Sequence, residues 1–127
     1  MISRRQARRQ ALLLLYQWDL SGNEIGSQFA GDLSPWAKDL ARDVAAHAEE
    51  LDAKITAASV GWTADRLGVV ERSALRVATR ELELREVPAE VVINEAVAFA
   101  KRYASDDAGR LVNGILGRIQ REEAVAK

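Results

Sequence analysis

Residues 88–116, PAEVVINEAVAFAKRYASDDAGRLVNGIL, decide the fold, because they read as two helices joined by a short polar turn. Successive residues lie about 100° apart around a helix axis, and on that spacing apolar side chains cover a broad arc of the first segment. These side chains are Val92, Ile93, Ala96, Val97, Phe99, Ala100 and Tyr103. A helix with such a wide apolar surface is expected at the centre of a helical protein.

The second segment of this stretch has a narrower apolar stripe, with two glycines on the other side. The stripe consists of Ala108, Leu111, Val112, Ile115, Leu116 and Ile119. Gly114 and Gly117 each cost a helix about 1 kcal/mol relative to alanine. We therefore expect another helix to pack closely against Gly114, or a ligand backbone to approach this side. Asn94 and Asn113 are expected to be buried polar anchors between helices.

Length and composition indicate one globular domain over residues 1–127. The chain has 127 residues, of which 48% are hydrophobic and 29% are charged, and it contains no cysteine. This length suits one core but not two ordinary domains, and no apolar run is long enough to cross a bilayer. The lack of cysteine excludes disulfides and fits a cytoplasmic protein. A net charge of −1 gives no overall attraction to nucleic acid, so any such binding depends on local clusters.

The rest of the chain also has helical periodicity, and no stretch shows the sustained alternation of a β-strand. We therefore predict an all-α protein. Ser34 and Pro35 form an N-cap and first-turn pair that restarts the helical pattern after a glycine-containing loop. The expected segments are a helix over 3–20, a loop over 21–34, a helix from 35 to near 61, a short turn over 63–67, a helix over 69–85 and a fraying charged tail over 121–127.

The first helix carries the clearest chemical signal. Its helical wheel places four arginines and a tyrosine on one outward arc; these are Arg4, Arg5, Arg8, Arg9 and Tyr16, called the arginine cluster below. Guanidinium groups make two-point contacts with phosphate, and a tyrosine ring can stack on an unpaired base, which suits single-stranded RNA. The alternative is that these residues only solvate an exposed helix. Positive charge in a first turn opposes the helix dipole by roughly 0.3–1 kcal/mol per charge, which favours a functional role.

A second arginine row and one misplaced carboxylate occur in the helix over 69–85. Arg72, Arg76 and Arg80 follow one another at helical spacing, and nearby glutamates favour a solvated, ion-paired face over an RNA surface. Glu81 falls inside the apolar half of the same helix, where an unpaired carboxylate is costly. It therefore needs a partner, either Arg85 one turn later or a group from another molecule.

Nothing in the sequence indicates an enzyme, a cofactor site or a metal site. His47 has no second ligand at helical spacing, so a surface or boundary position is the better interpretation. The pairs at 94–95 and 106–107 fit helix-surface and helix-start positions, the latter with Ser105 as the N-cap. No nucleophile elbow, phosphate loop or dinucleotide fingerprint occurs.

Three segments together resemble the NusB family of bacterial transcription antitermination factors. They are RRQARRQALLLLYQWDL at 4–20, VVERSALRVATREL at 69–82 and the stretch from Val87 to Leu116. The resemblance implies a compact all-α NusB-type fold of two packed helical bundles with about six to seven helices. It also implies binding of the boxA element of ribosomal RNA leaders together with NusE, a ribosomal small-subunit protein. The complex then joins RNA polymerase and suppresses termination.

Carried over by position, the resemblance assigns RNA binding to the arginine cluster and contact with NusE to Glu81. Arg80 stands where an aromatic residue is usual, and Gly117 stands where an acidic residue often occurs. Some members self-associate, so a homodimer with a structural role is one alternative. The other is an accessory module of an RNA methyltransferase, against which the lack of a methyl-donor segment argues.

Overall fold

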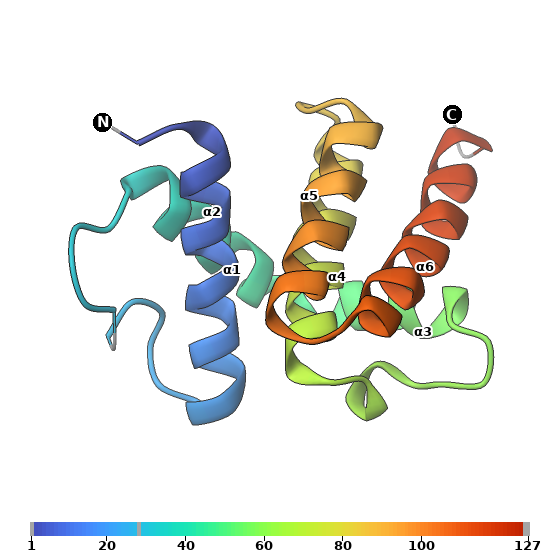
Figure 1. Ribbon diagram of the computed structural model, residues 1–127, viewed down its shortest axis with the longest axis horizontal. Coiled ribbons are helices and arrows are strands. Elements are labelled where there is room, and N and C mark those ends of the chain that lie inside the picture. Colours follow the sequence, from blue (N-terminus) through green and yellow to red (C-terminus); the bar gives the residue numbers. More distant parts are fainter. Residues whose placement is uncertain (1, 28, 126–127) are drawn as a thin grey trace.

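The computed structural model describes residues 2–27 and 29–125, and all regular secondary structure in those ranges is helical (Figure 1). This confirms the all-α prediction. The elements are α1 (Arg4–Ser21), α2 (Pro35–Ala46), α3 (Ala48–Ala58), the 3-10 turn η1 (Ala64–Arg66), α4 (Val69–Leu84), α5 (Ala89–Tyr103) and α6 (Asp106–Val125).

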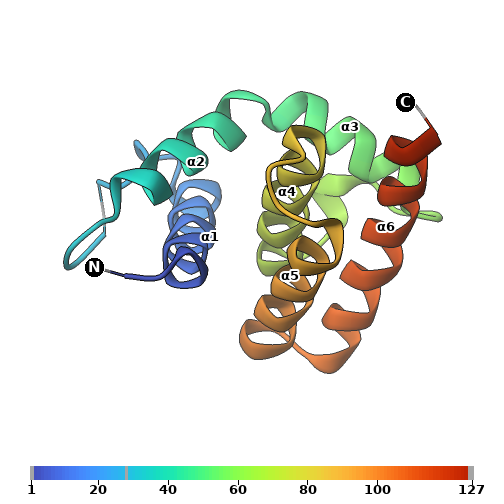
Figure 2. The ribbon, with the colours of Figure 1, turned by 90° about the horizontal axis from the view of Figure 1, so that it is seen from above.

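The helices form two groups that meet at α4. Figure 2 shows α1 and α2 on one side and α4, α5 and α6 on the other, with α2 and α3 following one another along one edge. Helix α2 packs on α1, α3 packs on α4 and α6, and α4 packs against each of the other five α-helices. The central helix is therefore α4. The prediction that α5 is central was wrong, because α5 lies on the outside of α4 and leaves Val91 and Tyr103 about two-fifths exposed.

One continuous hydrophobic cluster joins both groups. It contains fully buried leucines from four helices, namely Leu14, Leu15, Leu51, Leu75 and Leu116. Each such side chain contributes about 1.5–3 kcal/mol when it leaves water. The apolar stripe predicted for α1 is buried at Ala7, Ala11, Leu14 and Leu15. Burial of this stripe fixes the orientation of α1, and therefore the position of its other side relative to α4 and α5.

The expected single helix from Pro35 to near Gly61 is instead two helices, and this prediction was wrong. The break lies at His47, whose backbone angles of φ −105° and ψ 10° leave the helical region. Its ring Nδ1 lies 2.8 Å from the carbonyl oxygen of Asp43, so the side chain competes with the helix for a backbone acceptor. The predicted stripe persists on both sides of the break, since Leu40, Val44, Leu51 and Ile55 are all buried.

Other predicted boundaries agree with the structure except at the C-terminus. The described residues 22–27 and 29–34 are non-helical, and Ser34 and Ser105 cap their helices by accepting from the backbone N–H of Ala37 and Ala108. The tail expected to fray is helical as far as Val125, where α6 ends. Lys54 accounts for part of this order, because it bridges Glu83 on α4 and Glu123 on α6. The last two residues of the predicted tail lie outside the described ranges.

The bare side of α6 is open at Gly114, so the prediction that another helix packs closely there was wrong. A Cβ atom built on Gly114 meets no atom within 4 Å, so no helix packs there. Asn94 and Asn113, predicted as buried anchors, are both exposed. Close helix packing occurs one turn and a half earlier, where a Cβ on Gly109 would lie 2.5 Å from Cγ of Lys101 on α5.

Substitution Gly114→Ala is expected to raise the free energy of unfolding by roughly 0.5–1 kcal/mol, because alanine restricts the unfolded chain and fills open space. Urea denaturation followed by circular dichroism measures this change. Gly109→Ala is the matched control, and its gain should be smaller or reversed because Lys101 has to move. A loss of stability in Gly114→Ala would contradict the open environment of this position.

Candidate nucleic-acid interface

The first turns of α1 present arginines at the surface because the helix start is fixed by a capping box. Ser3 accepts from the backbone N–H of Gln6 at 3.1 Å, and the Gln6 side chain accepts from the Ser3 N–H at 2.9 Å. No acidic residue lies in the first turn. The guanidiniums of Arg4, Arg5 and Arg9 are exposed as predicted.

Arg8 differs from the other arginines of the cluster, and the prediction that all four face outward was wrong. Its side chain is 6% exposed, and it makes a two-point ion pair with Glu81 of α4. Arg8 Nε donates to Glu81 Oε1 at 2.7 Å, and Arg8 Nη2 donates to Oε2 at 3.0 Å. The pair therefore joins the basic face of α1 to the central helix.

The same ion pair answers the question of what neutralises Glu81. The expected partner was Arg85 or another molecule, but Arg85 instead donates to the backbone oxygen of Glu123. Glu81 is 5% exposed, and both of its oxygens accept from Arg8. Its assignment to NusE contact stays a prediction.

Trp36 of α2 supports the start of α1 from the side. The guanidinium carbon of Arg4 lies 4.3 Å from the centre of the Trp36 ring, and that of Arg8 lies 5.7 Å from it. Such cation–π contacts contribute about 0.5–1 kcal/mol at exposed sites. The ring thus holds Arg4 in place without neutralising its charge.

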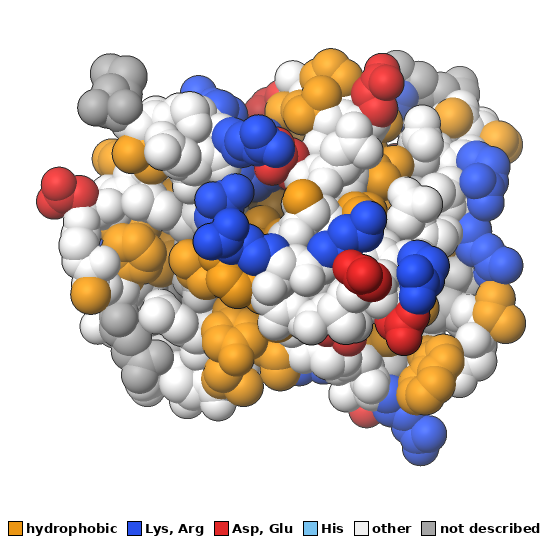
Figure 3. Space-filling model, in the orientation of Figure 1, with side chains coloured by type: hydrophobic (Ala, Val, Ile, Leu, Met, Phe, Trp, Pro, Cys, Tyr) orange, Lys and Arg blue, Asp and Glu red, His pale blue; other side chains and the backbone are white. Residues whose placement is uncertain are grey.

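A groove between α1 and α5 carries the strongest nucleic-acid signal of the structure. Its volume is ≈ 230 Å³, and it is lined by Arg8, Arg9, Leu12, Glu95, Ala98, Phe99, Arg102 and Tyr103. Figure 3 shows basic side chains gathered between these two helices. Within residues 2–27 and 29–125, neither Arg9 nor Arg102 makes an ion pair with a carboxylate. Both are therefore available to bind an anion.

Two residues of this groove were missed in the sequence. Tyr103 was placed in the apolar arc of α5, but it is 41% exposed, with its ring centre 4.8 Å from that of Phe99. The guanidinium of Arg102 lies 5.5 Å from the centre of the Tyr103 ring. The adjacent basic and aromatic residues at the end of α5 were a usable signal, but only the tertiary structure shows that they face α1.

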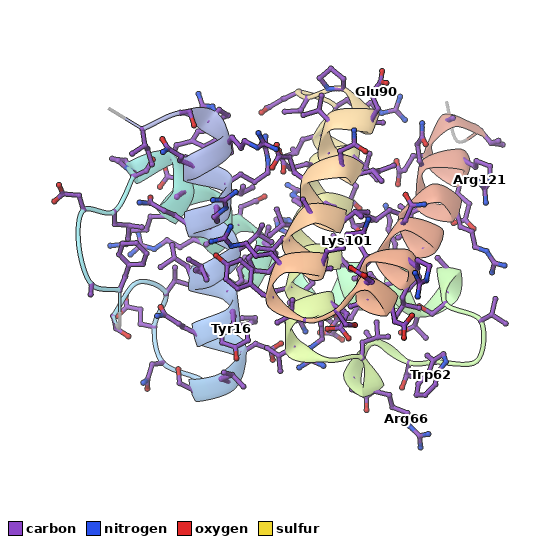
Figure 4. All side chains as sticks on the ribbon, viewed as in Figure 1. Tyr16, Trp62, Arg66, Glu90, Lys101 and Arg121 are labelled. Carbon is purple, nitrogen blue, oxygen red and sulfur yellow. The ribbon has the colours of Figure 1, made fainter. Side chains whose placement is uncertain are left out.

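Tyr16 is half-buried and lies beyond the groove along α1. It follows Arg9 by seven residues, which corresponds to about 10 Å of helix rise. Figure 4 shows it on the part of α1 nearer its C-terminal end. Tyr16 therefore extends the same side of α1 but does not line the groove.

The arginine row of α4 is ion-paired, as predicted, but it is packed between helices rather than solvated. Arg72 donates to Asp19 of α1, Arg76 to Asp52 of α3, and Arg80 to Asp43 of α2, all at 2.6–2.8 Å. These contacts join four helices. The row therefore has a structural role.

These ion pairs also perturb the titration of the arginines. Burial acts to lower the pKa of Arg76, but hydrogen bonding and proximity to Asp52 outweigh it, so this pKa is raised. Hydrogen bonding to Asp43 raises the pKa of Arg80. Both guanidiniums remain charged wherever the protein is folded.

Other functional classes receive no support from the described residues. In the part of the chain that the structure describes, no three His, Asp or Glu side chains cluster in a way that could hold a metal ion. No described helix is long and apolar enough to cross a membrane. His47 is about one-third exposed, which confirms a boundary position.

The NusB family model matches residues 5–121. This chain belongs to the NusB family. It is 40% identical to the transcription antitermination protein NusB of Exiguobacterium sp. over 128 residues, covering 96% of this chain and 100% of that protein. It is 39% identical to the NusB of Aquifex aeolicus, covering 91% of this chain and 86% of that protein.

Solved structures agree with the NusB family assignment and with the predicted NusB-type fold. A crystal structure of antitermination factors NusB and NusE in complex with dsRNA matches with a TM-score of 0.81 and 35% identity, over 94% of this chain and 96% of that chain. NusB of T. maritima matches with a TM-score of 0.84 and 32% identity, over 95% of this chain and 92% of that chain. A crystal structure of a plectonemic RNA supercoil matches with a TM-score of 0.87 and 35% identity over both full chains.

Proposed function

We propose that this NusB-family protein is an RNA-binding transcription antitermination factor. It binds the boxA element of nascent ribosomal RNA together with NusE, joins the antitermination complex on RNA polymerase in the cytoplasm, and has no catalysis of its own. The single observation that carries the RNA-binding part is the groove between α1 and α5. There two arginines without carboxylate partners, Arg9 and Arg102, flank the partly exposed ring of Tyr103.

The chemistry of the groove favours unpaired RNA. Arg9 on α1 and Arg102 on α5 line it from its two helices, where they can hold phosphates. The partly exposed ring of Tyr103 in this groove can stack on a base only when that base is free of its own helix. In this proposal Arg8 is a positioning residue, because its charge is used within the protein. Arg4 and Tyr16 extend the phosphate path along α1.

Binding of boxA-like RNA, measured by fluorescence anisotropy over a range of salt concentrations, tests the proposal. Each phosphate contact lowers the slope of log K against log salt by about 0.7 for single strands, so three arginines predict a slope near about −2. Single-stranded RNA should bind more tightly than the same sequence in a duplex, and NusE should strengthen binding. Absence of binding at low salt, or binding that does not depend on salt, would exclude an RNA-binding role for this surface.

A further inference from the structure

Glu95 is the one carboxylate among the described residues that line the α1/α5 groove. It lies on α5, and its side chain is 18% exposed. Arg5 Nε lies 2.9 Å from Glu95 Oε1. A negative charge weakens a site that only binds phosphate, so this carboxylate needs an explanation of its own.

Pairing with Arg5 does not fully explain Glu95. The Arg5 side chain is 67% exposed, and an ion pair with such an exposed partner contributes little to stability. The contact uses one oxygen, and within residues 2–27 and 29–125 the second oxygen accepts no hydrogen bond. A carboxylate has about four acceptor positions, so most of its accepting capacity is unused within the described residues, although Glu95 lines the groove.

Resting on the proposed RNA binding, we propose that the groove is a base-reading site and that Glu95 selects guanine in it. The Watson–Crick edge of guanine presents two adjacent donors, N1–H and the N2 amino group, which match the two oxygens of a carboxylate. Adenine, cytosine and uracil each present a donor next to an acceptor on this edge, and that acceptor faces a carboxylate oxygen unfavourably.

The walls of the groove fit one base held in this way. Tyr103 offers a surface for stacking, and Arg9 on the facing helix and Arg102 beside the ring can hold the adjacent phosphates. The volume of ≈ 230 Å³ is below the about 300–1,000 Å³ of pockets for drug-sized ligands, which suits a single base. Arg5 then pairs with Oε1 of Glu95 and leaves the other oxygen without a hydrogen-bond partner among the described residues.

The test compares short oligouridine RNAs that carry one central guanosine, inosine or adenosine. Inosine keeps N1–H but lacks the N2 amino group, so it should bind about tenfold more weakly than guanosine. Glu95→Gln should remove this difference, because its amide offers one acceptor and one donor. Glu90→Gln is the matched control, since Glu90 is an exposed carboxylate at the other end of α5 (Figure 4), and it should keep the preference.

Each outcome decides between the proposals. A guanosine preference that Glu95→Gln abolishes and Glu90→Gln retains supports base reading. RNA binding with no guanosine preference, or with a preference that survives Glu95→Gln, overturns base reading and leaves the proposed function intact. Failure of the wild-type protein to bind any of these RNAs, or boxA-like RNA, overturns both. If Glu95 only positions Arg5, then Arg5→Ala and Glu95→Gln should weaken the binding of all three RNAs equally. That result also overturns base reading.

Discussion

Arg8→Ala is expected to lower the free energy of unfolding by about 3–5 kcal/mol, because it leaves Glu81 buried without a counter-charge. Both side chains are about 95% buried, so water cannot readily replace the two hydrogen bonds of 2.7 and 3.0 Å that Glu81 would lose. Chemical denaturation followed by circular dichroism measures the change. Glu81→Lys should be at least as damaging, since it places two cations together.

A double variant separates the ion pair from simple loss of packing. Arg8→Met combined with Glu81→Leu fills the same space without charge, so it should be clearly more stable than either single change, and the double-mutant cycle should show strong coupling. If Arg8→Ala lowers the free energy of unfolding by less than about 1 kcal/mol, the loss is typical of a surface ion pair and contradicts a buried one. For the same reason, loss of NusE binding in Glu81→Lys would not demonstrate a contact.

Arg9→Ala combined with Arg102→Ala is expected to weaken binding of single-stranded RNA at least about a hundredfold. Each guanidinium removed deletes a charge-assisted contact of about 1.5–3 kcal/mol. The salt slope should become shallower by about 1.4, which is two contacts at about 0.7 each. Folding should be little affected, because neither arginine is ion-paired within the described residues.

The matched control for this variant is Arg66→Ala combined with Arg121→Ala. These two arginines lie in η1 and on α6, away from the groove, and their removal makes the same change in net charge (Figure 4). The control should bind RNA nearly as well as the wild type. Equal losses of RNA affinity in both double variants would mean that binding depends on the overall charge of the protein and that RNA does not occupy the groove.

Helical periodicity and capping chemistry were sufficient to predict most of the fold. Buried stripes such as Leu40, Val44, Leu51 and Ile55 were recognisable from spacing alone. The break at His47 was not, because it depends on one side chain competing for a backbone oxygen. The central place of α4 was also not predictable, since its polar face meets other helices through arginine–aspartate pairs that a helical wheel counts as solvent-facing.

Only part of the candidate site could be predicted from the sequence. Arg4, Arg5 and Arg9 were identified correctly as exposed, whereas Arg8 is one turn before buried Leu12 and shares its side of the helix. Glu81 was recognised as a misplaced carboxylate, but its pairing with Arg8 joins residues 73 positions apart and follows only from the tertiary structure. The same applies to Arg102 and Tyr103, which become part of the groove because α5 lies beside α1.

Cross-linking of 4-thiouridine-labelled boxA-like RNA to the protein, followed by mass spectrometry, tests most directly whether RNA lies between α1 and α5. Aromatic side chains outside the groove provide an internal comparison, because Trp62 is 53% exposed in the loop between α3 and η1. RNA bound between α1 and α5 should give cross-links at Tyr103 and along α1 toward Tyr16, and these should be lost in the Arg9→Ala, Arg102→Ala variant. Cross-links confined to Trp62, or unchanged in that variant, would contradict RNA binding there.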